Sequence, residues 1–545
     1  MRVDTILLNG VIHTGASEEQ VSALAVHADK VVAVGESCSG LDARRHVDLA
    51  GCAVVPGFHD AHNHMVWFGL GLDELDLSSP PLGSLEEVYQ AVAGRAGRQP
   101  AGSWIIGRGY DQNKLGGAHP HRARLDRAAP RHNVWLRHVS GHMCVVNSRV
   151  LDRLDLDGVP SGGDVVVDEQ GRPTGLLREQ AQMLLRPLTY PLPLEDLACA
   201  IDRAGQHYLT EGITSVQEAG IGGGWVGRSP VELSAYQLTR DRGRLRVRTT
   251  VMVALEALHE LEHHLSDEVD FGLDLGIRSG FGDDWLRIGP VKIFADGSLV
   301  GRTAALSTDY SDAPGNRGYF QLPSPQLREA VRRVHRAGWQ IATHAIGDLA
   351  VTEVLDAYAA ALEEAPRPNH RHRVEHCGVC RPEDVSRMAR LGVIPVPQGR
   401  FVNEIGDGMR TALGEERTAW CYRARSFLSA GLPLPASSDR PVVDGAPLLG
   451  LSDLVCRRTS TGAMFGEDER ITPAEALRAY TWGSAFAGFR EDRVGTLSPG
   501  YLADFVVLSA DPLGALDNDR ASELRVVGTV IGGKPAYDPE NLLGS

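Results

Sequence analysis

The chain has 545 residues, of which 43% are hydrophobic and 23% are charged. These proportions are typical of soluble globular proteins and exclude disordered, collagen-like and small disulfide-stapled proteins. The formal net charge is -15. Because nucleic-acid binding needs a concentrated basic surface, we expect no nucleic-acid partner.

The eight cysteines are scattered along the chain, without the density of a secreted disulfide framework. Asp4 interrupts the apolar start MRVDTILLNG, which argues against a signal peptide. We also find no uninterrupted apolar run that approaches the length of a membrane span. We therefore expect a cytoplasmic protein with reduced thiols and no membrane partner.

Both ends of the chain have the pattern of short β-strands. Residues 1–57 contain DTILLNGVIHTG and ALAVHADKVVAVG, with Gly and Asp between the apolar runs. Residues 490–545 have the same pattern of short strands, in VGTLSPGYLADFVVLSADP and LRVVGTVIGGKPAYD. We predict that these two ends form one small, discontinuous β-domain.

Over residues 58–489, apolar strand-like runs alternate with helical patterns, which is typical of parallel βα units. The candidate strands, in chain order, are AVVPGFHDAH, SWIIGRG, VWLRHVS, ITSVQ, RTTVMVA, VKIFADG, WQIATHA, HRVEHC, VIPVPQ and LPLPASSD. They outnumber the eight strands of a closed (β/α)8 barrel. Some must belong to an insertion, which we place in the Pro-interrupted region 70–193.

Histidines and an acid stand at the ends of several predicted strands. The run VVPGF leads into His62 and His64, whose side chains a strand turns to the same side. An isolated pair of this kind is more often two surface histidines on a loop. However, His344 ends WQIATHA, His376 ends HRVEHC, and Asp439 ends LPLPASSD. Because catalytic groups gather at the carboxyl ends of barrel strands, this repetition predicts a metal centre there.

Lys292 is the least usual residue of the predicted barrel. In VKIFADG, the alternation of a strand turns Lys292, Phe294 and Asp296 inward, which brings an ammonium group into the barrel lumen. An unpaired buried charge is costly. Two alternatives stay open: Lys292 pairs with a carboxylate such as Asp296 or Asp439, or it becomes a carbamate that bridges two metal ions.

Several motifs follow one another in the order and spacing of a known family: PGFHDAHNH, WIIGRGYD, SGHMCVVNS, GITSVQEAG, KIFADGS, THAIGD, RVEHC, SSDRP and LSPGYLADFVVL. Over nearly its whole length the chain resembles the YtcJ-like branch of the amidohydrolase superfamily, which includes N-substituted formamide deformylase. The resemblance implies an α/β fold: a distorted (β/α)8 TIM-like barrel at 58–489, flanked by a small β-sandwich domain formed from both termini.

The resemblance also assigns roles to individual residues. It implies strand-one metal ligands, a lysine that can be carboxylated, ligands on strands five and six, and an acid on strand eight; these are His62, His64, Lys292, His344, His376 and Asp439. His142, in SGHMCVVNS, is a candidate helper that polarises the substrate carbonyl. Nitrogen and oxygen donors of this kind suit zinc or a similar divalent ion. Whether one or two ions bind stays open, and an unmodified Lys292 would favour one.

The expected reaction is hydrolysis of a non-peptide carbon–nitrogen bond, in an amide or an N-substituted formamide. Water on the ion would attack as hydroxide, and Asp439 would accept its proton and return it to the leaving nitrogen. The expected partner is a small-molecule substrate, and a homodimer is our default assembly. A non-catalytic barrel of the same family is the first alternative.

A zincin-type peptidase is the second alternative. HELEH, with His259, Glu260 and His263, matches the HExxH pattern in which two histidines hold zinc and the glutamate acts as base. The surrounding sequence predicts an exposed acidic amphipathic helix and offers no clear third ligand. We therefore rank this site well below the barrel site.

Overall fold

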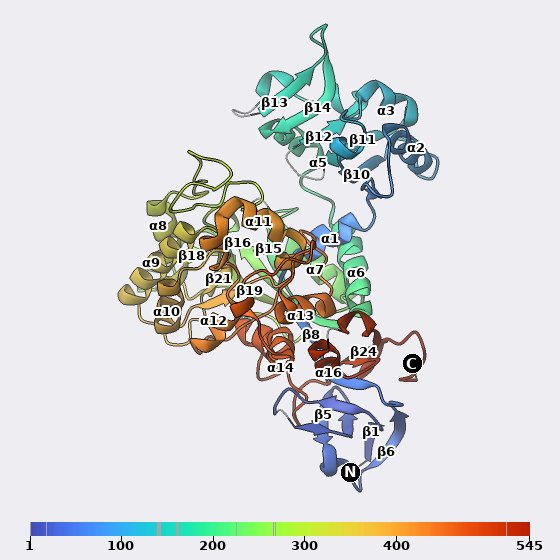
Figure 1. Ribbon diagram of the computed structural model, residues 1–545, viewed down its shortest axis with the longest axis vertical. Coiled ribbons are helices and arrows are strands. Elements are labelled where there is room, and N and C mark those ends of the chain that lie inside the picture. Colours follow the sequence, from blue (N-terminus) through green and yellow to red (C-terminus); the bar gives the residue numbers. More distant parts are fainter. Residues whose placement is uncertain are drawn as a thin grey trace. The chain divides into compact units, whose positions relative to one another are not determined.

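The computed structural model describes residues 2–17, 19–138, 143–159, 163–224, 226–264, 266–267, 269–518 and 520–544. Contacts divide the chain into two compact units (Figure 1). One unit is Met1–Phe68 with Leu194–Ser545, and the other is Gly69–Pro193. Among the described residues, no helix combines the length and the apolar character that crossing a bilayer requires.

A parallel sheet of seven strands curves into a nearly closed barrel in the larger unit. In order along the sheet the strands are β8 (Phe58–Asn63), β15 (Ile213–Ile221), β16 (Arg248–Ala254), β19 (Leu286–Phe294), β20 (Ile341–Ala345), β21 (Arg373–His376) and β22 (Ile394–Val396). Most of their residues are buried, as expected for parallel strands covered on both faces. The barrel fold predicted from the sequence is confirmed.

The eighth position of the barrel is filled by the extended segment 433–439 rather than by a regular strand. The amide of Ala61 donates to the carbonyl of Ala436 (3.0 Å), which joins the segment to β8. On the other side, the Ser437 hydroxyl donates to the carbonyl of Pro397 (3.1 Å), just beyond β22. Pro433 and Pro435 have no amide hydrogen to donate, so a continuous ladder cannot form here.

Helices cover the outside of the barrel. α9 (Asp348–Glu364) buries Val351, Val354, Leu355 and Tyr358, which recur at helical spacing on one face. It packs between α8 and α10 (Figure 1). The other helices of this unit, with α1 reaching the unit boundary, are α1 (Met65–Gly71), α6 (Leu194–Thr210), α7 (Glu232–Asp241), α8 (Ser324–Arg336), α10 (Pro382–Leu391), α11 (Arg400–Thr418), α12 (Ala424–Ser429), α13 (Pro447–Cys456), α14 (Pro473–Arg478), α15 (Ser484–Ala487) and α16 (Pro512–Asp517).

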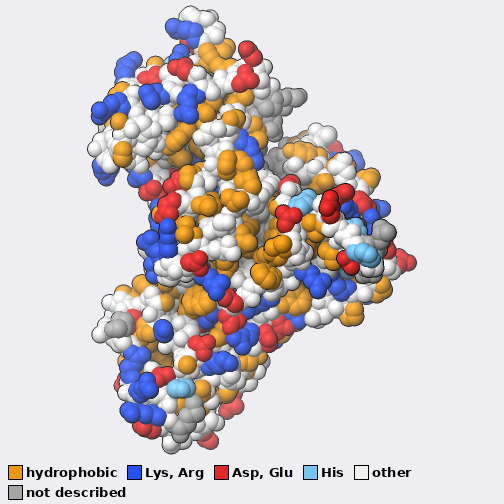
Figure 2. All heavy atoms as spheres, turned by 180° about the vertical axis from the view of Figure 1, so that it is seen from behind, with side chains coloured by type: hydrophobic (Ala, Val, Ile, Leu, Met, Phe, Trp, Pro, Cys, Tyr) orange, Lys and Arg blue, Asp and Glu red, His pale blue; other side chains and the backbone are white. Residues whose placement is uncertain are grey.

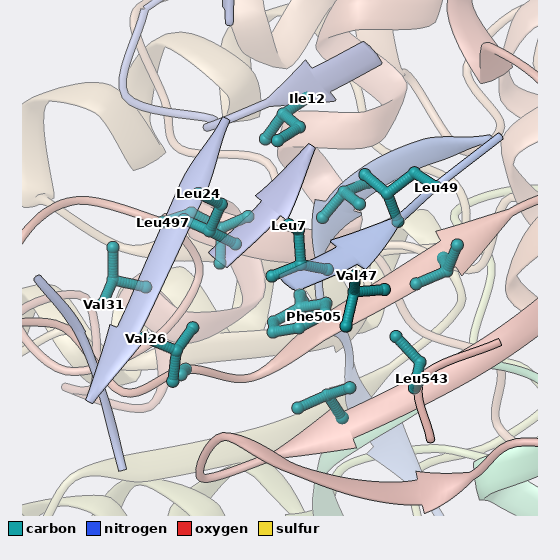
Figure 3. Packing of buried hydrophobic residues seen from close by; sticks show 14 of the residues in the cluster. Leu7, Ile12, Leu24, Val26, Val31, Val47, Leu49, Leu497, Phe505 and Leu543 are labelled. Atoms are coloured by element: carbon teal, nitrogen blue, oxygen red, sulfur yellow. The ribbon is translucent and has the colours of Figure 1, made fainter. Parts of the chain in front are cut away.

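Strands from both ends of the chain form the predicted β-sandwich. One sheet has the order β5-β4-β1-β6 and the other β25-β24-β23-β7-β2-β3. Their bounds are β1 (Arg2–Leu8), β2 (Val11–His13), β3 (Gln20–Val21), β4 (Leu24–His27), β5 (Lys30–Val34), β6 (Asp42–Asp48), β7 (Ala53–Pro56), β23 (Phe505–Leu508), β24 (Val526–Ile531) and β25 (Lys534–Tyr537). Leu7, Leu24, Val47 and Phe505 meet in the core between the sheets (Figure 3).

The smaller unit, Gly69–Pro193, has its own sheet and its own core. The sheet has the order β13-β14-β12-β11-β10-β9, from β9 (Leu75–Asp76), β10 (Trp104–Tyr110), β11 (Asn133–His138), β12 (Met143–Val146), β13 (Gly163–Val167) and β14 (Pro173–Glu179). Its helices are α2 (Leu85–Ala96), α3 (Arg122–Ala128), α4 (Ser148–Leu151) and α5 (Arg186–Thr189). The predicted strands SWIIGRG and VWLRHVS are therefore part of this unit rather than of the barrel.

The predicted helix at the HELEH motif is wrong. His259 and Glu260 form the short strand β17, which pairs antiparallel with β18 (Phe271–Gly272). His263 follows in a loop, where its Nδ1 donates to the carbonyl of Leu261 (3.0 Å). Local helical preference is weak, and pairing with β18 overrides it here. The two imidazoles therefore do not lie one helical turn apart.

Charged side chains of both signs cover the surface. On the face drawn in Figure 2, Lys and Arg are interspersed with Asp and Glu, and hydrophobic side chains lie between them. The acidic excess of the chain is therefore not gathered into one block on this face.

Candidate metal centre

Three of the predicted ligands meet at the carboxyl end of the barrel. His62, His376 and Asp439 each offer one ligand atom, and these atoms all lie within 4.8 Å of one another. His62 lies in β8, His376 ends β21, and Asp439 ends the extended segment in the eighth position. All three residues are buried. Segments that are distant in the sequence thus bring two imidazoles and a carboxylate together.

His64 joins the same group from the residue just after β8. Its Nε2 lies 3.2 Å from Asp439 Oδ1, and the Nε2 of His62 lies 3.3 Å from the same oxygen. The two imidazole rings are 5.6 Å apart between centroids. Both histidines of the HxH pair therefore face one carboxylate oxygen.

His344 and Lys292 complete the group. The ring of His344 lies 4.5 Å from that of His376, and its Nε2 donates to the carbonyl of Gly297 (2.9 Å). Lys292 is 1% exposed, and its Nζ lies 3.5 Å from His62 Nε2. His142 lies outside the described residues, so its helper role stays a prediction.

Lys292 has no carboxylate partner among the described residues. Asp296, one of the two predicted partners, instead accepts hydrogen bonds from the backbone amides of Ala305, Ile346 and Gly347 at 2.8 to 3.0 Å. Burial lowers the pKa of the Lys292 ammonium to about 8, against a smaller opposing effect of nearby carboxylates. Of the alternatives left open, the pairing with Asp296 is therefore not formed, and the Lys292 ammonium releases its proton more easily than an exposed lysine does.

Two of the meeting residues have left-handed backbone conformations. The φ angle is 67° at His376 and 58° at Asp439. Non-glycine residues seldom adopt such angles, which cost on the order of 1 kcal/mol each and cluster at functional sites. The turn at His376 also breaks the alternation of β21, because Glu375 and His376 both contact His62.

Hydrogen bonds fix which ring nitrogens face the centre. His62 Nδ1 contacts the carboxylate of Glu375, and His376 Nδ1 lies 2.8 Å from Gln398 Oε1. The amide nitrogen of Gln398 donates to Val396 and Ser437, so its oxygen is the atom that faces His376. Both Nδ1 atoms must therefore carry the hydrogen, which leaves the Nε2 lone pairs toward the centre. This arrangement fits a divalent ion bound by nitrogen and oxygen donors.

The site holds its carboxylates in the charged form. Burial alone would raise the pKa of Asp439, but contacts with His62 and His64 keep that pKa well below its usual range. Burial is likewise outweighed at Glu375, whose pKa is lowered by Arg373 and His62. Ionised carboxylates therefore face or support the imidazoles.

Sequence reasoning missed three buried groups that contact the predicted ligands: Glu375, Gln398 and Glu218. A signal was present in RVEHC, where Arg373 and Glu375 share one face of a buried strand. Two opposite charges in such a strand indicate a buried pair, because each charge is costly alone. Strict alternation from His376, however, points Glu375 away from the centre.

Comparisons with known proteins identify the family to which the chain is similar. A sequence model described as "Amidohydrolase family" matches residues 45–537. YtcJ of Bacillus subtilis (strain 168) is 32% identical over 500 residues, covering 90% of each chain. N-substituted formamide deformylase of Arthrobacter pascens is 28% identical over 557 residues, covering 98% of each chain.

A solved structure is similar in both sequence and fold. An uncharacterized metal-dependent hydrolase from Pyrococcus horikoshii OT3 superimposes with a TM-score of 0.76 at 29% identity, covering 93% of this chain and 98% of that one. The family match spans more than half of the sequence and includes every strand of the barrel. This chain therefore belongs to the amidohydrolase family, in its YtcJ-like branch.

Proposed function

We propose that this metal-dependent hydrolase cleaves a non-peptide carbon–nitrogen bond, in an amide or an N-substituted formamide. One observation carries the proposal: donor atoms of His62, His376 and Asp439, from two strands and the extended segment in the eighth position, lie within 4.8 Å of one another in a buried group. The substrate class is supported by the deformylase relative, which aligns over 98% of both chains.

The proposed ligands are the six residues assigned from the sequence: His62, His64, Lys292, His344, His376 and Asp439. Zinc suits their nitrogen and oxygen donors, and the number of ions depends on the state of Lys292. When bound, such an ion lowers the pKa of water and polarises a carbonyl oxygen.

Asp439 is the proposed proton carrier. Its carboxylate is ionised and lies against the Nε2 atoms of His62 and His64. It accepts a proton from the attacking water at a carboxylate oxygen and returns that proton to the leaving nitrogen, which departs as a neutral amine. Burial around the site keeps bulk water away from these transfers.

Lys292 is proposed to carry a carboxyl group on Nζ. The ammonium first releases one proton to solvent, the neutral amine attacks the carbon of carbon dioxide, an N–C bond forms, and a second proton leaves to solvent. This step replaces a buried cation that has no carboxylate partner among the described residues with an anionic oxygen ligand. It thereby removes the cost of an unpaired buried ammonium.

A metal assay together with a substrate panel tests the proposal. Protein produced with zinc is analysed for bound metal, and its mass shows whether one carbon dioxide has been added. It is then given N-substituted formamides, cyclic amides and N-acyl amino acids. We expect bound zinc and hydrolysis of the formamides or other amides, and loss of activity in Asp439→Asn.

Asp453→Asn is the matched control, because Asp453 is also a buried aspartate. It lies in α13 and pairs with Arg400 in α11 (2.8 Å). This variant should remain active. Absence of bound ion in the wild type would favour the non-catalytic barrel. If His259→Ala abolished activity and His62→Ala did not, the peptidase alternative would replace the proposal.

A further inference from the structure

A buried ion pair crosses the barrel beneath the candidate centre. Arg373 and Glu375 lie two residues apart in β21, and both are 0% exposed. Arg373 donates from Nε to Glu375 Oε1 (2.7 Å) and from Nη2 to Oε2 (2.8 Å). The same guanidinium donates to the carbonyl of Ala61 in β8 (2.8 Å) and to Gln217 Oε1 in β15 (2.5 Å). The pair therefore joins β21 to β8 and β15 inside the lumen.

Besides Arg373, the carboxylate of Glu375 contacts His62. Its Oε2 contacts His62 Nδ1, and an ionised carboxylate can only accept a hydrogen bond. His62 must then carry its hydrogen on Nδ1. Its Nε2 lone pair is left toward Asp439 Oδ1 (3.3 Å) and Lys292 Nζ (3.5 Å). The positive charge of Arg373 offsets the desolvation cost of this buried carboxylate. An unpaired carboxylate at this position would be strongly destabilising.

The other imidazoles of the centre have weaker supports. His64 Nδ1 lies 3.7 Å from Glu218 Oε1, which is beyond hydrogen-bond distance. The other oxygen of Glu218 accepts from the hydroxyl of Tyr236 (2.6 Å) and the amide of Val66 (3.2 Å). His376 and His344 have neutral acceptors, an amide and a backbone carbonyl. Asp439, which faces His64 Nε2, is itself a proposed ligand, and Asp296 Oδ1 lies 3.5 Å from His344 Nε2. Among the described residues, the contact between Glu375 and His62 is thus the shortest one between an imidazole of the centre and a carboxylate that is not a proposed ligand.

We infer that Glu375 is a positioning residue that fixes His62 in its Nδ1–H form and aims Nε2 at the bound ion. This inference rests on the proposed function, because it assumes that His62 is a ligand. A carboxylate behind a ligating imidazole both orients the ring and makes it a stronger donor, and its loss typically weakens metal binding about 10- to 100-fold. Glu218, at its longer distance, should contribute less to His64.

Zinc affinity measured apart from folding stability tests the inference. We would titrate metal-free protein with zinc against a chromophoric chelator and record the melting temperature of the metal-free form separately. Glu375→Gln should weaken zinc binding roughly 10- to 100-fold, and Glu218→Gln by less. The matched control is Asp504→Asn, which disrupts another buried pair with two contacts, from Arg248 Nε (2.5 Å) and Nη2 (2.9 Å). It should lower the melting temperature and leave zinc affinity unchanged.

Two further measurements cover the case in which Glu375→Gln does not fold. Glu375→Asp keeps a charge for Arg373 but withdraws it from His62 by one methylene, so it should also weaken zinc binding. In the metal-free wild type, nitrogen-15 NMR of histidine should show His62 protonated on Nδ1, identified by the signals lost in His62→Gln. Protonation on Nε2 would overturn the inference even if no Glu375 variant could be made.

The two proposals fail in different ways. If the wild type binds zinc and Glu375→Gln binds it as tightly, the positioning role is wrong while the proposed function stands. If the wild type binds no divalent ion, the proposed function fails first. A loss of zinc affinity in Asp504→Asn equal to that in Glu375→Gln would show a merely structural effect and would also overturn the inference.

Discussion

His62 and Asp439 are joined twice, once through the backbone and once through their side chains. The amide of Asp439 donates to the carbonyl of His62 (2.8 Å), and Asp439 Oδ1 lies 3.3 Å from His62 Nε2. The backbone bond is part of the closure between β8 and the segment in the eighth position. The same contact that closes the barrel therefore sets the separation of two proposed ligands before any ion binds.

Replacements of Asp439 should separate charge from backbone conformation. Asp439 has a φ of 58°, which Asn tolerates better than Ala. Asp439→Asn and Asp439→Ala should both lose at least about 100-fold in kcat, as expected when a proton carrier is removed. Asp439→Ala should additionally be less stable than Asp439→Asn by about 1 kcal/mol. Steady-state kinetics and urea unfolding measure the two effects, and equal stability of the variants would contradict the argument from φ.

Lys292→Met should stabilise the metal-free protein at neutral pH. The buried ammonium loses hydration without gaining a carboxylate partner among the described residues, whereas Met fills a similar volume. We expect a gain of roughly 1–3 kcal/mol in the free energy of unfolding, together with loss of activity. Because burial lowers the folded pKa to about 8 from 10.5, the gain should shrink as pH rises from about 8 to 10.5. Urea unfolding across this range, without carbon dioxide, measures it.

Glu232 should make stability fall as pH rises toward neutrality. Burial raises its pKa to about 7 from 4.5, so the folded state holds a proton that the unfolded state has already released. The resulting stability is present below about pH 4.5 and is lost as pH rises to about 7. Glu232→Gln should flatten this part of the stability profile by roughly 1–3 kcal/mol. The same substitution at exposed Glu415 is the control, and parallel profiles for both variants would refute the prediction.

The grouping of the proposed ligands could be predicted because parallel strands end at the same edge of a barrel. Alternation placed His62 and His64 on one side, and a polar residue at each of the later strand ends pointed to the same rim. No three-dimensional information was needed for this step, since strand order and direction follow from the βα pattern.

The remaining features depend on tertiary structure. The role of Glu375 was hidden because the left-handed turn at His376 breaks the alternation on which the prediction relied. The segment LPLPASSD occupies a barrel position without being a strand, since Pro433 and Pro435 interrupt its ladder. At HELEH, the local sequence favoured a helix, and pairing with β18 overrides this preference.

Two buried histidines that are hydrogen-bonded to each other, His335 and His372, should make the fold sensitive to acid. His372 Nδ1 accepts from the amide of Ile341 (3.1 Å), so its Nε2 carries the hydrogen that it donates to His335 Nδ1 (2.8 Å). His335 Nε2 in turn donates to the carbonyl of Ala365 (2.7 Å). Every nitrogen of the pair is used in its neutral form. An added proton on either ring would place two N–H groups against each other.

The sign of the pH effect follows from the direction of the pKa shifts. Burial lowers the pKa of both His335 and His372 below 6.5, so below that pH the unfolded chain binds protons that the folded chain does not. Stability should therefore be present above about pH 6.5 and be lost as the solution is acidified. His372→Asn keeps an acceptor oxygen near the position of Nδ1 but cannot be protonated, so it should lose less stability between neutral and acidic pH.

Urea unfolding of the metal-free protein at several pH values measures the slope of the free energy of unfolding against pH. The matched control is His259→Asn at an exposed histidine in β17, which should leave the slope unchanged. An acid slope in His372→Asn as steep as in the wild type would show that this pair does not set the acid limit of the fold.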